Sequence, residues 1–320
     1  MGKVRLAVVG VGEFGKNHVR IVRQSERAEL VAVVDSNAAR AAEVAAANGC
    51  AAFAGLRELI GKVDAAIVAV PTSAHADVGC SLLEAGIDVL VEKPIAPDLA
   101  SADRLILAAA SHRRILQIGH LERFNPAVIA LEKVARLPLF FEIHRLSVFS
   151  PRSLDIDVVL DLMIHDIDIL LSLVPAEIEE IRAAGISILT PKVDIANVRL
   201  QFKGGCVANI TASRVSTDRV RKLRLFQPNQ YISVDYGRQD VAVFSVGEGR
   251  QISFQQLTVT KAEPLSLQFD AFLNSVETRQ TPKLSGHVGR LNLEAALAIL
   301  AKIEEHSRVV AQSLVSGWKP

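Results

Sequence analysis

The first residues whose types and spacing suggest chemistry form a glycine-rich turn. An apolar segment, Val4 to Val9, leads into Gly10-Val11-Gly12-Glu13-Phe14-Gly15 and then into a helical pattern. Gly10 permits a tight turn, Gly12 lets the backbone approach a pyrophosphate, and Gly15 allows close packing of the helix whose N-terminus holds the anion. Asp35 ends the next apolar segment, 20 residues beyond Gly15. Together these features form a dinucleotide-binding fingerprint in its required context.

The acidic residue also bears on the choice of cofactor. A carboxylate at position 35 would accept a hydrogen bond from a ribose 2′-hydroxyl and repel a 2′-phosphate, so the sequence predicts NAD rather than NADP. Arg40 is the reason for caution, because it could swing over the adenosine ribose, although we favour the interpretation of a solvated helix arginine. The candidate cofactor contacts in this region are Gly10, Gly12, Glu13, Phe14, Gly15, Asp35 and Ser36.

Lys93 is a candidate acid–base residue. It stands in Glu92-Lys93-Pro94, directly after the apolar run Val89 to Val91, and so at the carboxyl end of a strand, where open α/β sheets bind ligands. Pro94 biases Lys93 towards an extended backbone. A lysine has a pKa of about 10.4, and the positive nicotinamide ring of bound NAD would disfavour its charge and bring the pKa towards a useful range for acid–base chemistry. A surface lysine paired with Glu92 is the alternative.

A second set of polar residues lies in an otherwise apolar helical segment, Val158 to Leu173. Asp161 and His165 are four residues apart and share a helix face, so both could point at one substrate. Asp166 and Asp168 follow, and acids in such an apolar run require partners or a polar cleft. The alternative for Asp161 and His165 is a simple pair on the helix surface. The set contains neither a cysteine nor an HExxH arrangement, so we expect no metal site.

Composition restricts the class of partner. The 320 residues suggest two domains, and 36 Lys plus Arg against 35 Asp plus Glu leave almost no net field, which argues against nucleic acid or an anionic membrane. Cys50, Cys80 and Cys206 are widely separated, as expected of reduced thiols in a cytoplasmic protein. No stretch approaches the length of a membrane span. We therefore expect a cytoplasmic protein whose partners are small molecules or copies of itself.

The elements that must position these residues fall into two halves. Residues 1–120 alternate short β-branched runs with Ala-rich helical patterns, which predicts a doubly wound parallel sheet, a Rossmann domain. Residues 121–320 show period-two alternation, which predicts an α+β domain with a large, mostly antiparallel open sheet and helices on one face. Val198, Leu200 and Phe202 alternate along one strand of it. We interpret them as an open face that packs against another subunit, in a homodimer or homotetramer.

At this point the motifs, in their order, resemble the glucose-fructose oxidoreductase and inositol dehydrogenase family, called Gfo/Idh/MocA. The resemblance covers essentially the whole chain and rests on Gly10-x-Gly12-x-x-Gly15, Pro71-Thr72-x-x-His75, Glu92-Lys93-Pro94, Arg123-Phe124-x-Pro126 and Asp161-x-x-x-His165. It implies a nicotinamide-dependent oxidoreductase in which Lys93 and His165 provide acid–base chemistry at a sugar hydroxyl while Asp161 orients the substrate. It also implies cofactor contacts from Pro71, Thr72, His75, Glu92 and Lys93.

A finer resemblance points to the substrate. The segments 119–126 and 157–168 are similar to the branch that includes UDP-N-acetylglucosamine 3-dehydrogenases, and Ser150 to Leu154 replaces the Gly-rich approach of many members. A nucleotide-sugar diphosphate needs cations, and the substrate-binding candidates are Arg123, Asn125, Arg152, Asp161, His165 and Arg214. A free-sugar or inositol dehydrogenase is the alternative within enzymes. A regulator that binds NAD without catalysis is the alternative outside them, and the intact Lys93, Asp161 and His165 argue against it.

Overall fold

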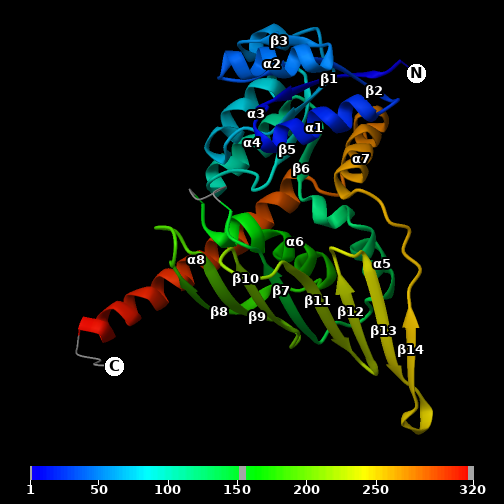
Figure 1. Cartoon of the computed structure of the whole chain (residues 1–320), viewed down its shortest axis with the longest axis vertical. Coiled ribbons are helices and arrows are strands. Elements are labelled where there is room, and N and C mark those ends of the chain that lie inside the picture. Colours follow the sequence, from blue (N-terminus) through cyan, green and yellow to red (C-terminus); the bar gives the residue numbers. More distant parts are fainter. Residues whose placement is uncertain (1, 151–155, 316–320) are drawn as a thin grey trace. The chain divides into compact units, whose positions relative to one another are not determined.

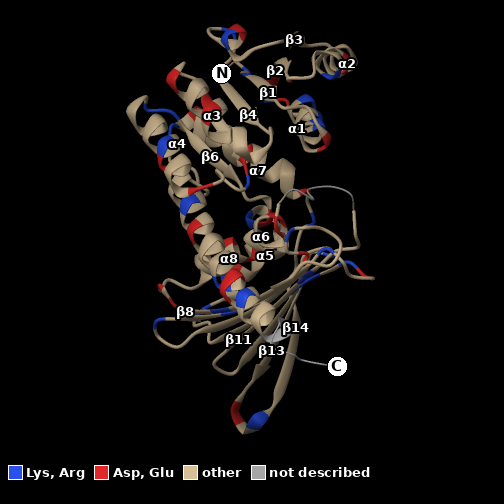
Figure 2. Ribbon diagram, turned by 90° about the vertical axis from the view of Figure 1, so that its left-hand side faces the viewer, with Lys and Arg blue, Asp and Glu red and all other residues tan. Residues whose placement is uncertain are grey.

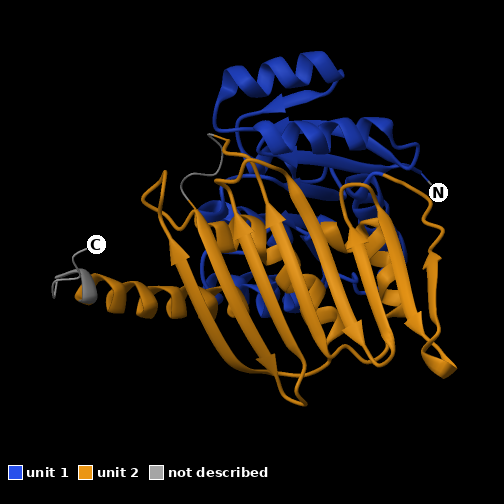
Figure 3. Cartoon of the chain, turned by 60° about the horizontal axis from the view of Figure 1, so that its bottom comes forward, with its two compact units in different colours: residues 1–121, 263–293 blue, residues 122–262, 294–320 orange. Residues whose placement is uncertain are grey.

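The chain folds into two compact units. The computed structural model describes residues 2–150 and 156–315. Unit 1, blue in Figure 3, comprises residues 1–121 and 263–293, and unit 2, orange, comprises residues 122–262 and 294–320. The sequence led us to place everything beyond residue 120 in the second domain. The structure differs for residues 263–293, which belong to unit 1.

Unit 1 is built on a parallel sheet with the strand order β3-β2-β1-β4-β5-β6 in the described residues (Figure 1). This is the order of a dinucleotide-binding fold, and it confirms the doubly wound sheet. The inner strands are apolar and buried because helices cover both faces. The strands are β1 Val4–Val9, β2 Ala28–Val34, β3 Ala51–Phe53, β4 Ala65–Val68, β5 Asp88–Glu92 and β6 Leu116–Gly119.

Local capping fixes the helices between these strands. Asn37 accepts from the backbone N–H of Arg40 to start α2 (Ala38–Asn48), and Gly49 ends it in the left-handed region. Asp98 starts α4 (Leu99–Ser111) in the same way, through Ser101. The remaining helices of this alternating region are α1 (Glu13–Gln24) and α3 (His75–Glu84).

Helix α7 (Pro264–Thr278) explains why a late segment belongs to unit 1. Its residues Phe269 and Phe272 are buried in the same core as Val19 and Val22 of α1. Arg279, just after α7, forms an ion pair with the buried Asp88 at the start of β5. The apolar face of α7 therefore completes the cover of the parallel sheet.

Unit 2 contains an open sheet with the order β14-β13-β12-β11-β7-β10-β9-β8 among the described strands (Figure 1). Every neighbouring pair is antiparallel except β7 and β10, which confirms a mostly antiparallel sheet. The strands are β7 Phe140–Leu146, β8 Ile178–Ile186, β9 Ile195–Phe202, β10 Val207–Ser213, β11 Val220–Gln227, β12 Gln230–Asp235, β13 Asp240–Val246 and β14 Ile252–Gln256.

The sequence interpretation of the open face was wrong about which side faces outward. Val198, Leu200 and Phe202 are fully buried in the core of unit 2. They pack with residues of α5 (Pro126–Val134), α6 (Ile164–Leu173) and the middle of α8 (Gly286–Val315). Period-two alternation identifies two faces but does not say which one the chain's own helices cover.

A row of aromatic rings crosses the other face of the sheet. Phe140, Phe226, Tyr231, Phe244 and Phe254 stand opposite one another on β7, β11, β12, β13 and β14. Successive ring centroids lie 5.0–5.7 Å apart. Phe254 is 61% exposed and Phe226 is 37% exposed. Exposed apolar area of this kind is typical of an interaction surface.

Charged residues of both signs are interspersed along the helices and loops of each unit (Figure 2). Among the described residues, none of the helices is long and apolar enough to cross a membrane.

Candidate active site

The glycine-rich turn of unit 1 forms a cradle that side chains would fill. Gly10 has a φ of +86°, and a Cβ there would lie 2.6 Å from the Ala69 carbonyl oxygen. A Cβ on Gly15 would lie 1.9 Å from the Gly10 carbonyl oxygen, so α1 packs directly on the turn. At Gly12, just before α1, a Cβ would meet nothing within 4 Å. The N-terminus of α1 is therefore open to an anion, and Glu13 and Phe14 occupy its first turn.

Asp35 ties this turn to the end of β2. Its Oδ2 accepts from the Val11 N–H at 2.8 Å and its Oδ1 accepts from the Asn37 N–H at 2.8 Å. Arg40 donates to both oxygens, at 3.1 and 2.7 Å. Burial alone would raise the pKa of the Asp35 carboxyl, but these hydrogen bonds outweigh it and hold the pKa below its ordinary value. Ser36 beside it is exposed.

A buried histidine and carboxylate lie at the base of Lys93. Glu92 Oε1 lies 2.8 Å from His18 Nε2 of α1, and both side chains are buried. Glu92 Oε2 accepts from the Lys93 N–H at 3.3 Å. A Cβ on Gly119 of β6 would lie 2.7 Å from this carboxylate, so glycine makes the space for it. The pair fixes the backbone from which the half-buried Lys93 side chain leaves β5.

His18 is not among the site residues predicted from the sequence. The helical pattern could have identified it, because His18 lies on the buried face of α1 among apolar residues, where an imidazole needs a hydrogen-bond partner.

His75 joins two of the predicted cofactor segments. Its Nδ1 lies 2.9 Å from the Pro94 carbonyl oxygen and its Nε2 lies 3.0 Å from that of Val70. Burial lowers the pKa of His75, whereas its hydrogen bonds with the Pro94 and Val70 carbonyl groups act in the opposite direction. Pro71 and Thr72 lie just before it, at the start of a short 3-10 turn, and Pro71 is exposed.

In unit 2, Asp161 lies in a π-helical turn, Val159–Met163, that leads directly into α6. The predicted helix from Val158 to Leu173 is present, but it begins with this wider turn, a feature often found at functional sites. Asp161 is partly exposed, whereas His165 in the first turn of α6 is 8% exposed. Asp161 and His165 therefore lie on consecutive turns of one helical segment.

Two other acids of α6 have arginine partners in the core of unit 2. Arg145 of β7 forms a two-point ion pair with Asp166, at 2.7 and 2.9 Å. Arg145 also contacts Glu122 at 3.0 Å. Arg123 donates to Asp168 Oδ1 at 3.2 Å. These pairs meet the requirement for partners that the apolar helix implied.

The substrate-binding candidates differ in what surrounds them. Besides Asp168, Arg123 contacts Glu132. Asn125 caps α5 and donates to Glu122 and to the Tyr236 carbonyl oxygen. Arg214, after β10, is 4% exposed and forms an ion pair with Asp194. Arg152 lies outside the described residues. The fold therefore supplies partners within unit 2 for Arg123, Asn125 and Arg214.

In the described parts of the chain, no group of three or more His, Cys, Asp or Glu side chains is arranged to hold a metal ion.

Comparison with known proteins assigns both units to one family of oxidoreductases. Residues 4–120 match the model described as oxidoreductase family, NAD-binding Rossmann fold, and residues 146–229 match the GFO/IDH/MocA C-terminal domain. The UDP-N-acetylglucosamine 3-dehydrogenase of Acidithiobacillus ferrooxidans is 36% identical over 94% of this chain and 97% of that protein. The myo-inositol 2-dehydrogenase of Thermotoga maritima is 26% identical over 98% of this chain and its own full length.

Solved structures agree with these sequence relationships. A crystal form of the Acidithiobacillus ferrooxidans enzyme superposes with a TM-score of 0.90 at 37% identity, covering 95% of this chain and 99% of that one. The glycine cradle of unit 1 and the sheet of unit 2 thus occur together in an NAD-binding oxidoreductase, and the chain belongs to the Gfo/Idh/MocA family.

Proposed function

We propose that this protein is an NAD-dependent dehydrogenase of a nucleotide-sugar, acting on UDP-N-acetylglucosamine at its 3-hydroxyl. The observation that carries the proposal is the 36% identity to the UDP-N-acetylglucosamine 3-dehydrogenase over nearly the full length of both chains. The reaction converts a secondary alcohol to a ketone: the carbon loses a hydride and the oxygen loses a proton.

The cradle of unit 1 fits a dinucleotide. Gly12 leaves open space beside the N-terminus of α1, where a pyrophosphate would bind the helix N–H groups. Glu13, Phe14, Asp35 and Ser36 lie around this end, and Pro71, Thr72, His75 and Glu92 are the further contacts we propose. When bound, NAD accepts the hydride at C4 of its nicotinamide ring.

We assign the proton chemistry to Lys93 and His165. Lys93 takes the hydroxyl proton, with His165 as its partner or substitute, and Asp161 orients the sugar by accepting from a hydroxyl group. Glu92 and His18 hold the backbone of Lys93, which supports a role that depends on accurate placement.

We propose that NAD is preferred to NADP. The Asp35 carboxylate stays ionised because its pKa is lowered, so it would repel a 2′-phosphate. Arg40 neutralises part of this charge, which limits the preference.

Inositol oxidation is the second candidate, favoured by the similarity to the myo-inositol 2-dehydrogenase. Its lower identity of 26% makes it the weaker one.

A substrate panel tests the proposal. NAD and purified protein are mixed with UDP-N-acetylglucosamine, UDP-glucose, glucose or myo-inositol, and NADH is followed by absorbance. We expect a rate with UDP-N-acetylglucosamine, abolished by Lys93→Met with NADH binding retained. A rate with myo-inositol alone would overturn the nucleotide-sugar proposal, and full turnover in Lys93→Met would overturn the role of the lysine.

We further propose a homodimer or homotetramer assembled through the aromatic face of the unit 2 sheet. The row from Phe140 to Phe254 supports this, because it leaves aromatic side chains partly exposed.

A further inference from the structure

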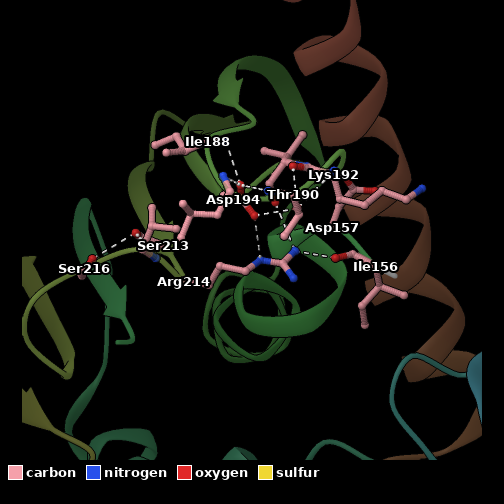
Figure 4. A network of polar contacts seen from close by, with 12 residues as sticks. Ile156, Asp157, Ile188, Thr190, Lys192, Asp194, Ser213, Arg214 and Ser216 are labelled. Atoms are coloured by element: carbon pink, nitrogen blue, oxygen red, sulfur yellow. Dashed lines mark hydrogen bonds and ion pairs between the residues drawn. The ribbon is translucent and has the colours of Figure 1, made fainter. Parts of the chain in front are cut away.

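The loop between β8 and β9 is organised around one buried carboxylate (Figure 4). Asp194 is fully buried, and its Oδ2 accepts from the N–H groups of Ile188, Leu189 and Thr190 at 2.7, 2.6 and 2.9 Å. Its Oδ1 accepts from the Thr190 hydroxyl at 2.8 Å. A carboxylate with this many donors is rigidly oriented and remains ionised.

Arg214 connects this loop to the start of the helical segment that contains Asp161. Its Nε lies 3.5 Å from Asp194 Oδ1. Its Nη2 donates to the carbonyl oxygen of Ile156 and, at 3.2 Å, to that of Val193. In Figure 4 the guanidinium lies between the Asp194 loop and Ile156. The planar group therefore holds two separate pieces of chain at once.

A second set of bonds joins the same two pieces. Asp157 Oδ1 accepts from the Val193 N–H at 2.9 Å, and the Val158 N–H donates to the Val193 carbonyl oxygen at 3.0 Å. The Asp161 N–H then donates to the Asp157 carbonyl oxygen at 3.0 Å. An ion pair and several hydrogen bonds thus link Asp194 and its neighbour Val193, through Arg214 and Asp157, to the backbone of Asp161.

We propose that Arg214 and Asp194 are positioning residues that fix the first turn of the helical segment carrying Asp161 and His165. This inference rests on the proposed function, because it concerns the residues assigned there. It changes the role expected of Arg214 from the sequence: the guanidinium acts through the helix start rather than on the substrate diphosphate. Both side chains are buried, and the Arg214 guanidinium donates to the carbonyl oxygens of Ile156 and Val193.

The decisive variants are Arg214→Met, Arg214→Lys and Asp194→Asn. Arg182→Met is the matched control, because it removes an exposed arginine of the adjacent strand β8. A misplacement of about 1 Å costs up to about 100-fold in rate, so we expect kcat of Arg214→Met to fall about 10- to 100-fold. Arg214→Lys should recover part of the loss, because an ammonium keeps the charge but cannot bridge as many acceptors.

Kinetic and binding measurements separate a positioning role from other roles. If Arg214 and Asp194 position the helix, Arg214→Met lowers kcat and raises the primary deuterium isotope effect on the transferred hydrogen. The Kd for NADH then stays within twofold of that of the wild type. A higher KM with unchanged kcat would show a substrate contact and overturn the proposal. A fall in Vmax that only follows the folded fraction, with the isotope effect and pH profile unchanged, would show a merely structural role and also overturn it.

Hydrogen–deuterium exchange tests the positioning role of Arg214 without turnover. Arg214→Met should speed exchange of the amides of residues 157–163, and Arg182→Met should not. Equal exchange in wild type and Arg214→Met would overturn the proposal. A wild-type protein that oxidises none of the substrates in the panel would instead refute the proposed function. The exchange result would still show whether Arg214 holds the start of the helical segment.

Discussion

The pairing of Asp35 with Arg40 predicts how strongly the protein discriminates between NADH and NADPH. Arg40→Ala removes the guanidinium that donates to both oxygens of Asp35, and leaves the carboxylate with two backbone donors, from Val11 and Asn37. A 2′-phosphate would then meet an unneutralised negative charge. Asp35→Asn has the opposite effect, because it removes the charge and frees Arg40 to contact the phosphate.

The magnitude follows from Coulomb's law and the exposure of the pair. Two unit charges about 4 Å apart interact by about 1 kcal/mol in water and about 4 kcal/mol at an effective dielectric constant of about 20. The Arg40 side chain is 41% exposed, whereas that of Asp35 is 3% exposed, so the lower half of this range applies. A change of about 1–2 kcal/mol corresponds to about a 5- to 30-fold change in the ratio of the two Kd values.

Fluorescence titration of NADH and NADPH measures this ratio directly. At one fixed ionic strength, we expect Kd(NADPH)/Kd(NADH) to rise about 5- to 30-fold in Arg40→Ala and to fall by a similar factor in Asp35→Asn. Arg23→Ala, at the opposite end of α1, controls for overall charge. An unchanged or smaller ratio in Arg40→Ala would refute the assignment of this pair to the 2′-position.

Three further predictions follow from other parts of the structure. Gly15→Ala brings a Cβ against the Gly10 backbone and should lower the melting temperature by several degrees, at about 2–4 °C per kcal/mol of lost stability. Gly12→Ala should keep the melting temperature of the wild type and weaken NADH binding. Equal melting temperatures of the two variants would contradict this difference. Phe244→Arg should shift sedimentation towards the monomer, and an unaltered assembly would exclude the aromatic face. The pKa of Asp194 is about 2, below the ordinary 3.8, because hydrogen bonds from backbone N–H groups and from Thr190 outweigh the effect of burial. Its contribution to the free energy of unfolding is therefore present above pH 3.8 and is lost as the pH falls through 2. Wild type should therefore lose about 2 kcal/mol more than Asp194→Asn between about pH 5 and pH 2 in denaturant unfolding, and parallel losses would contradict the assignment.

The parts of the fold that follow from local chemistry were predictable. The ends of α2 and α4 follow from local signals, because Asn37, Gly49 and Asp98 specify helix ends by their own side chains or backbone freedom. The return of residues 263–293 to unit 1 was not predictable in this way. It depends on where the aromatic residues of α7 find an apolar surface, which is a property of the packed core.

The same distinction applies to the candidate site. The place of Lys93 at the end of β5 follows from a short apolar run and Pro94. The partners of Asp166 and Asp168 do not, because Arg145 and Arg123 reach α6 from other elements whose register only the folded chain fixes. The role of Arg214 was likewise hidden, since burial by the β8–β9 loop is a tertiary effect.

The arginines around α6 together explain how an apolar helix can present its polar residues in one orientation. Apolar packing is non-directional, so a helix rich in Ile and Leu could rotate or shift by a fraction of a turn at low cost. Buried ion pairs add little net stability, because desolvation offsets their attraction. Their hydrogen bonds are directional, however, and Arg145 on Asp166, Arg123 on Asp168 and Arg214 on the Ile156 carbonyl hold the segment at three points along its length. We therefore expect apolar replacements of the Arg145–Asp166 pair to lower kcat in the folded protein, because the helix would lose a constraint on its rotation. Unchanged kcat in such a double variant would show that packing alone fixes Asp161 and His165.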